Sequence, residues 1–281
     1  MTNLPLFPPS IPAPYKEEDS IRFTLSLTFL EEGLLVVTRD EQEVVYTTCI
    51  SYPLPCDTNL SSILGELVYS YPFLTFNYKK ILLRFFPTER VVVPTVLTDP
   101  LKDPFWLATV ATPLEGTYVG TFEVDASKDQ CVIATWDKES FSFLRRTYSG
   151  VLPLPLTVLS LSSLQKESLI KKHRVVHILV DKSRLELSMG QKGELLFTNS
   201  FERHSYTNLS SEESLQQQVL FYWTAMCKSL QIDNVVEDEV KLFLPPKNSI
   251  GQEELSVLKE NFIATFSEMG VVFSFHSYTD L

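Results

Sequence analysis

The feature that most limits how this chain can fold is an order of predicted elements that occurs twice. In the first half, short runs of alternating or continuous apolar residues indicate strands, and turn-forming residues separate them. The run after Ser20 has apolar residues at every second position, as in a strand with one buried face. The elements predicted here are strands at 21–27, 34–38 and 44–51, a helix beginning at Asp57 or Asn59, and a strand at 80–86.

The second half repeats this order with a nearly constant offset of about 150 to 160 residues. A constant offset across several elements is typical of an internal duplication, although the residues themselves differ. Between the two sets, helical pieces are predicted from Pro94 to Ala111, strands at 118–124 and 131–136, and a helix at 138–148. The second set is predicted as strands at 173–180, 184–189 and 194–201, a helix at 211–230, a strand at 240–244, a helix at 253–269 and a strand at 271–275.

The duplication predicts two lobes of mixed α/β structure, each with a mixed sheet opened by a three-stranded meander. We place the first lobe at residues 20–150 and the second at 157–281. The segment at 151–156 has two prolines and is the expected linker. Residues 1–19 contain five prolines and are expected to form an extended N-terminal strap.

This duplicated order resembles the actin-like ATPase superfamily, whose members share a ribonuclease H-like fold. A closer resemblance rests on the run ELLFTNSFE at 194–202 and on the following helix, which ends in Phe221-Tyr222-Trp223. These features are similar to an uncharacterised bacterial family that has an actin-like ATPase fold and no assigned function. The specific match covers about 60 residues, and the fold-level match covers nearly the whole chain after Ser20. Because fold does not determine function, the site needs a separate argument.

The resemblance implies an Asp-x-Gly turn between the first two strands of each half, which holds magnesium and phosphates in working ATPases. In the first half this turn contains Glu31 and Glu32, which either supply a carboxylate or are simply solvated. In the second half Asp181 stands where the family has its aspartate, and Ser183 replaces the glycine. A Cβ at this position obstructs the close backbone approach that a phosphate requires.

Other features also weaken the expectation of nucleotide binding. Nine glycines in 281 residues are about 3%, below the usual value of about 7%. The place of the adenosine-binding Gly-Gly reads Pro245-Pro246, and proline removes backbone donors. We therefore disfavour ATP hydrolysis and predict no cofactor.

Two hypotheses follow for the function. The first is a non-catalytic actin-like scaffold that binds another protein, with a homo-oligomer also allowed. The second is a divergent nucleotide-binding protein or ATPase, in which Asp181 with Glu31 or Glu32 faces the metal and Ser183 contacts a phosphate.

Composition bears on other partners. The net charge of −11 disfavours nucleic acid, because the densest basic run, at 171–174, is short. The acidic triplet at 237–239 is interpreted as the end of a loop rather than a cation site. His173 and His177 are four residues apart on a predicted strand, about 13 Å along its axis, so we do not expect a metal pair. No apolar run is long enough to span a membrane and no secretory signal is recognised, so we expect a cytoplasmic protein.

Overall fold

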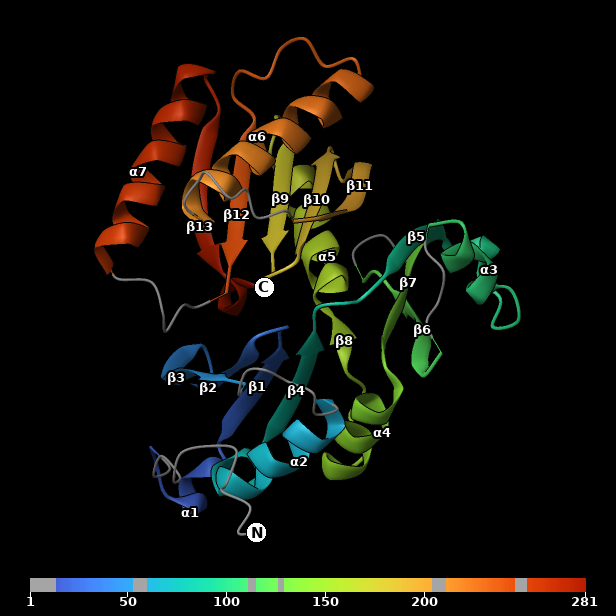
Figure 1. Ribbon diagram of the computed structural model, residues 1–281, viewed down its shortest axis with the longest axis vertical. Helices are drawn as coiled ribbons and strands as arrows, with labels where there is room; N and C mark the ends of the chain where they lie inside the picture. Colours follow the sequence, from blue (N-terminus) through green and yellow to red (C-terminus); the bar gives the residue numbers. More distant parts are fainter. Residues whose placement is uncertain (1–13, 53–59, 111–114, 126–128, 204–210, 246–251) are drawn as a thin grey trace. The chain divides into compact units, whose positions relative to one another are not determined.

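The computed structural model describes residues 14–52, 60–110, 115–125, 129–203, 211–245 and 252–281 (Figure 1). The chain divides into two compact units, and each is described by itself. Unit 1 comprises Met1–Val93, Leu97–Phe122 and Val132–Leu156, and unit 2 comprises Pro94–Val96, Glu123–Cys131 and Thr157–Leu281. Among the described residues, no helix is both long and apolar enough to cross a membrane.

Unit 1 contains a five-stranded mixed sheet with the strand order β3-β2-β1-β4-β8. The first three strands are antiparallel, and β4 runs parallel to β1 and to β8. Its elements are α1 (Glu17–Ser20), β1 (Phe23–Phe29), β2 (Gly33–Asp40), β3 (Glu43–Ser51), α2 (Leu60–Ser70), η1 (Pro72–Thr75), β4 (Lys80–Phe85), α4 (Lys138–Thr147) and β8 (Leu154–Pro155). The apolar residues on one side of α2 are the ones that it buries, namely Ile63, Leu64 and Leu67.

Residues between β4 and α4 form a separate three-stranded sheet with the order β5-β7-β6. Its elements are β5 (Arg90–Pro94), η2 (Thr95–Leu97), α3 (Asp103–Ala108), β6 (Thr117–Glu123) and β7 (Gln130–Asp137). The helical pieces expected after Pro94 are therefore present as η2 and α3.

Unit 2 repeats the plan with the strand order β11-β10-β9-β12-β13. Here too the first three strands are antiparallel, and the next strand, β12, runs parallel to the first. The strand β13 runs parallel to β12. The elements are α5 (Leu156–Ile170), β9 (Val175–Val180), β10 (Arg184–Gln191), β11 (Glu194–Glu202), α6 (Ser211–Ser229), β12 (Glu239–Leu244), α7 (Gln252–Glu268), β13 (Val272–Ser277) and η3 (Tyr278–Asp280).

The two faces of the second sheet differ in chemistry. One face is covered by α6 and α7 (Figure 1) and forms an apolar core with Val176, Ile178 and Leu242 from the strands. Trp223 of α6 and Phe266 of α7 belong to the same core. The opposite face carries the alternate side chains, which point toward α5. Polar residues of β9, β10 and β12 are therefore buried on the α5 side.

The helix α5 is the longest element that the sequence did not predict. Its sequence, LTVLSLSSLQKESLI, mixes leucine and serine without a one-sided period, and before Leu169 most of its hydrophobic residues and serines are buried. A helix that is buried on more than one side lacks the apolar stripe by which an amphipathic helix is recognised. The segment expected to be a linker accordingly holds β8 and the first residue of α5.

Two smaller differences concern the N-terminal region. The first strand begins at Phe23, because residues 17–20 form α1 and Ile21 is 63% exposed. Residues 1–13 of the expected proline-rich strap lie outside the described residues. Tyr15, just after them, bonds through its hydroxyl group to Thr38 Oγ1 at 2.8 Å and to the Tyr78 hydroxyl group at 2.7 Å.

Candidate functional site

The turn between β1 and β2 holds the two glutamates that the sequence singles out. Both Glu31 and Glu32 are exposed, and the Leu30 N–H donates to Gly33 O at 3.0 Å to close the turn. A Cβ on Gly33 would lie 2.6 Å from the backbone oxygen of Ile50 on β3. The close approach of β3 therefore explains why this position needs a glycine, and a bound anion is not required for that explanation.

The turn between β9 and β10 is built differently. Asp181 is only 5% exposed, and its N–H donates to Arg184 O at 2.9 Å. The Lys182 N–H donates to Asp181 Oδ1 at 2.8 Å. Two backbone amides that a phosphate-binding turn would offer to its ligand thus donate within the turn itself.

Arg203, which follows β11, reinforces the same turn. Its guanidinium donates to Asp181 O at 2.6 Å, and its backbone N–H donates to Ser183 O at 2.7 Å. Ser183 is half-buried. The structure thus brings Asp181 and Ser183 together in one turn of unit 2, whereas Glu31 and Glu32 belong to a turn of unit 1.

Two further buried groups lie near Asp181 and were not predicted. The Tyr278 hydroxyl group is fully buried and donates to Val180 O at 2.6 Å. Burial raises the pKa of Tyr278 well above its ordinary value, and the negative charges of Asp181 and Glu186 add to this effect. Glu186 is 2% exposed and accepts a hydrogen bond from Thr157 Oγ1 at 2.7 Å. The strand pattern offered no signal for this cluster, because Glu186 alternates with apolar residues in β10 as a solvent-facing residue would.

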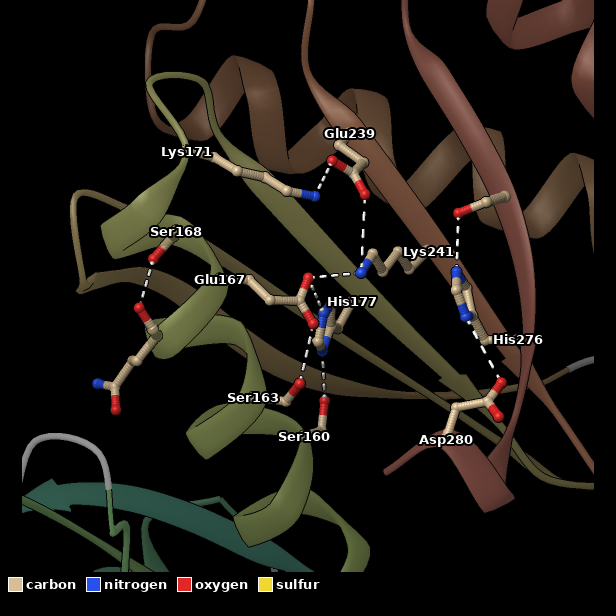
Figure 2. A network of polar contacts seen from close by, with 12 residues as sticks. Ser160, Ser163, Glu167, Ser168, Lys171, His177, Glu239, Lys241, His276 and Asp280 are labelled. Atoms are coloured by element: carbon tan, nitrogen blue, oxygen red, sulfur yellow. Dashed lines mark hydrogen bonds and ion pairs between the residues drawn. The ribbon is translucent and has the colours of Figure 1, made fainter. Parts of the chain in front are cut away.

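A larger polar network joins α5 to the strands β9 and β12 (Figure 2). Lys241 of β12 lies directly opposite His177 of β9 in the parallel register. Glu167 of α5 accepts from Lys241 Nζ at 2.5 Å and from Ser163 Oγ at 2.9 Å. His177 is 1% exposed; its Nδ1 lies 3.2 Å from Ser160 Oγ and its Nε2 lies 3.7 Å from Glu167 Oε2.

Electrostatics in this network favour a charged glutamate and a neutral histidine. Burial alone would raise the pKa of Glu167, but the contacts with His177 and Lys241 outweigh it and bring this pKa well below its ordinary value. Glu167 lies 3.7 Å from His177 and 2.5 Å from Lys241, so the lysine is its principal partner. Burial lowers the pKa of His177 more strongly than Glu167 raises it.

The network continues into the basic run that the sequence analysis weighed for nucleic acid. Glu239 forms ion pairs with Lys171 and with Lys241 at 3.7 Å, and its Oε2 lies 3.4 Å from His173 Nε2 (Figure 2 draws the two lysines). The neighbouring pair joins Arg174 Nε to both carboxylate oxygens of Asp238, each at 3.0 Å. Lys171 and Arg174 of the basic run are therefore paired with Glu239 and Asp238 of the acidic triplet.

The remaining histidine in the described part of unit 2 lies on the same side of the sheet. His276 Nε2 bonds to Ser274 Oγ at 2.9 Å, and its Nδ1 lies 3.5 Å from Asp280 Oδ2 (Figure 2). The Phe243 ring lies between this histidine and His177, at centroid distances of 5.3 and 5.0 Å. Within the described ranges, no cluster of three histidine, cysteine, aspartate or glutamate side chains is arranged to hold a metal ion. The contacts of Ser160 with His177 and of Glu167 with Lys241 hold α5 on the sheet.

Comparison with known proteins places the chain in context. The family described as "Protein of unknown function (DUF3822)" matches residues 15–253. No curated protein matches the sequence.

Among solved structures, a Bacteroides thetaiotaomicron protein with an actin-like ATPase fold and unknown function is similar to this chain. It has 15% sequence identity and a TM-score of 0.72, and the match covers 92% of this chain and 93% of that one. The PilM–PilN type IV pilus biogenesis complex has 12% identity and a TM-score of 0.49, over 92% and 89% of the two chains. The similarity to the Bacteroides thetaiotaomicron protein confirms the predicted duplicated actin-like ATPase fold.

The resemblance to actin-like ATPases implies ATP and magnesium, and the β9–β10 turn does not fit that group. The carboxylate of Asp181 is buried, and amides of its turn are committed to internal bonds. Pro245 follows β12, at the place of the adenosine-binding glycines, while Pro246 lies outside the described residues.

Proposed function

We propose that this chain, which belongs to the family of proteins of unknown function DUF3822, is a non-catalytic actin-like scaffold that binds another protein. The observation that carries the proposal is the β9–β10 turn. The backbone N–H groups of Asp181 and Lys182 donate to acceptors within this turn. Arg203 donates to the carbonyl oxygens of Asp181 and Ser183. A nucleotide would have to break these bonds before the turn could cradle its phosphates.

The charges of the described residues support a protein rather than a nucleic acid as the partner. The chain carries a net charge of −11. Lys171, His173 and Arg174, from its densest basic run, are paired with acidic residues of unit 2. A phosphate backbone would meet repulsion without a compensating cluster of bases. A homo-oligomer is compatible with this proposal.

A divergent nucleotide-binding protein or ATPase is the second candidate function. It is favoured by the position of Asp181, at the end of β9, where the resemblance implies an aspartate on the metal side. In that case Glu31 or Glu32 would be the second carboxylate and Ser183 would contact a phosphate.

Calorimetric titration with ATP and magnesium separates the two functions. The scaffold predicts no detectable heat at millimolar nucleotide and an unchanged melting temperature. Micromolar binding by the wild-type chain would overturn the scaffold, whatever the variants show. Asp181→Ala and the pair Glu31→Gln with Glu32→Gln would then identify which turn holds the metal, with circular dichroism as the control for folding.

A further inference from the structure

A groove with a volume of about 500 Å³ lies between the helices α2 and α4 of unit 1. The two helices lie side by side (Figure 1), and the described residues that line the groove all belong to unit 1. The side formed by α4 holds two cations, one carboxylate, one hydroxyl group and one aromatic ring. These are Lys138, Glu139, Ser142, Phe143 and Arg146. We call this site the α2–α4 groove.

Hydrogen bonds between the sides of the groove hold it in shape. Ser61 Oγ of α2 donates to Glu139 Oε2 at 3.1 Å. The Lys138 N–H donates to Gly116 O, just before β6, at 3.1 Å. The groove is therefore formed before a partner arrives, which reduces the ordering cost of binding. Among the described lining residues Glu139 is the only acid, and its carboxylate is engaged with the α2 side.

Lys138 and Arg146 give the groove a local surplus of positive charge. Both side chains are exposed, and neither forms an ion pair within the described ranges. They stand eight positions apart on α4, or about 12 Å along the helix axis, with Ser142 midway between them. Phe143, next to Ser142, is half-buried and offers an apolar contact between the two cations.

The local surplus, and not the charge of the whole chain, decides what binds in the groove. The chain carries a net charge of −11, but at physiological ionic strength charges are screened beyond about 8 Å. Sites for small molecules enclose most of their ligand, whereas Lys138, Ser142 and Arg146 are exposed. Two cations are also too few for a nucleic acid, whose affinity comes from several phosphates at once. A segment of a protein is the ligand that can reach both cations.

From these observations we infer that the α2–α4 groove binds an acidic segment of another protein. Carboxylates of the segment pair with Lys138 and Arg146, and an apolar side chain between them contacts Phe143. An extended segment covers about 13 Å in four residues, so carboxylates four positions apart match the spacing of the two cations. The inference rests on the proposed scaffold function and names the chemistry of its partner.

The test is a selection of random displayed peptides on the wild-type chain, followed by affinity measurements with the recovered peptides. The double variant Lys138→Ala with Arg146→Ala removes both cations, and alanine favours the helix. Lys79→Ala with Lys80→Ala is the matched control, because it removes two exposed cations elsewhere in unit 1 and changes the net charge equally. We expect acidic peptides, with affinity lowered about tenfold by the double variant and unchanged by the control.

Ser142→Glu tests the same contacts without removing a cation. The new carboxylate would stand one helical turn from both Lys138 and Arg146, and would compete with the peptide for them. We expect a loss of affinity similar to that of the double variant. Added salt should also weaken the wild-type complex, because its ion pairs are exposed.

The inference is overturned if the selection recovers no acidic peptide, or if the double variant binds the recovered peptides as well as the wild type does. It is also overturned if sedimentation shows a wild-type dimer that the double variant loses, since the occupant would then be a second copy. Micromolar binding of inorganic phosphate, lost in the double variant, would assign the groove to a small anion instead. Circular dichroism and the melting temperature of each variant confirm that it is folded. ATP calorimetry tests the proposed function independently, so the two can fail separately.

Discussion

The two sheets of this protein share one strand order, but the acidic residues in and beside their first turns differ in burial. In unit 1 the turn carboxylates of Glu31 and Glu32 are exposed. In unit 2 Asp181 and Glu186 are at most 5% exposed, and His177 is 1% exposed. The duplication therefore fixes the positions of the strands, whereas the burial of side chains near equivalent turns differs between the two units.

The physical reason for the difference is the helix α5. Its side chains supply partners for the buried polar residues, with Thr157 bonded to Glu186, Ser160 to His177 and Glu167 to Lys241. Buried polar groups persist when such partners are present and are costly when they are not. Four sets of substitutions test this comparison.

The largest effect is expected from Lys241→Met, which leaves the carboxylate of Glu167 without its closest cation. Removing one member of a largely buried ion pair costs about 3 kcal/mol. Lys102→Met in unit 1 is the matched control; its side chain is 70% exposed in its pair with Asp99, and little change is expected. Urea unfolding of both variants measures the difference. Equal losses would show that the unit 2 pair is no more important than a surface pair.

Gly33→Ala is expected to destabilise unit 1 by about 2 kcal/mol, as overpacking does. The new Cβ would meet Ile50 O at 2.6 Å, and this oxygen is held in the β2–β3 pair. Gly65→Ala is the control, because no atom lies within 4 Å of its Cβ position and the site is inside α2. Alanine there should stabilise the helix by up to about 1 kcal/mol. A neutral Gly33→Ala in thermal unfolding would contradict the explanation for this glycine.

The pH dependence of unit 2 should reveal His177. Its folded pKa is lowered from the ordinary value of 6.5, so below pH 6.5 the unfolded chain binds a proton that the folded chain does not. Stability is then lost as the pH falls through 6.5. The pKa of Glu167 is lowered from 4.5, so its contribution disappears only below that pH.

His177→Gln removes the first of these titrations while keeping a polar side chain near Ser160. Urea unfolding of both chains at pH 7.5, 6.5 and 5.5 should therefore show a flatter profile for the variant. Identical slopes between pH 6.5 and 5.5 would exclude His177 as their source.

The smallest effect compares the two turns directly. Asp181→Asn removes the charge from a buried acceptor that binds the Lys182 N–H, and we expect a loss of about 1 kcal/mol. Glu31→Gln with Glu32→Gln should leave stability within about 0.5 kcal/mol, because both side chains are exposed. Thermal unfolding of the two variants measures both stability losses. A larger loss for the Glu31 and Glu32 variant would mean that the exposed turn contributes more to stability than the buried one.

Much of the fold was readable from the sequence, because strands and amphipathic helices leave a local period. The predicted meanders correspond to β1–β3 and β9–β11, and their duplication pointed to the actin-like fold. The helix α5 was missed because burial on several sides erases that period. The lobe boundaries at 20–150 and 157–281 and the proposed roles of Asp181 and Ser183 stay predictions.

The sequence by itself determined the order of the elements and drew attention to Asp181, through its place after a buried strand. Only the tertiary structure decided that Asp181 is enclosed by Arg203, and that Glu167 meets Lys241 across 74 positions of sequence. It also paired the basic run at 171–174 with the acidic triplet at 237–239. Local periodicity reports which way a side chain faces, whereas parallel strand pairing brings together residues from distant parts of the chain and thereby chooses their partners.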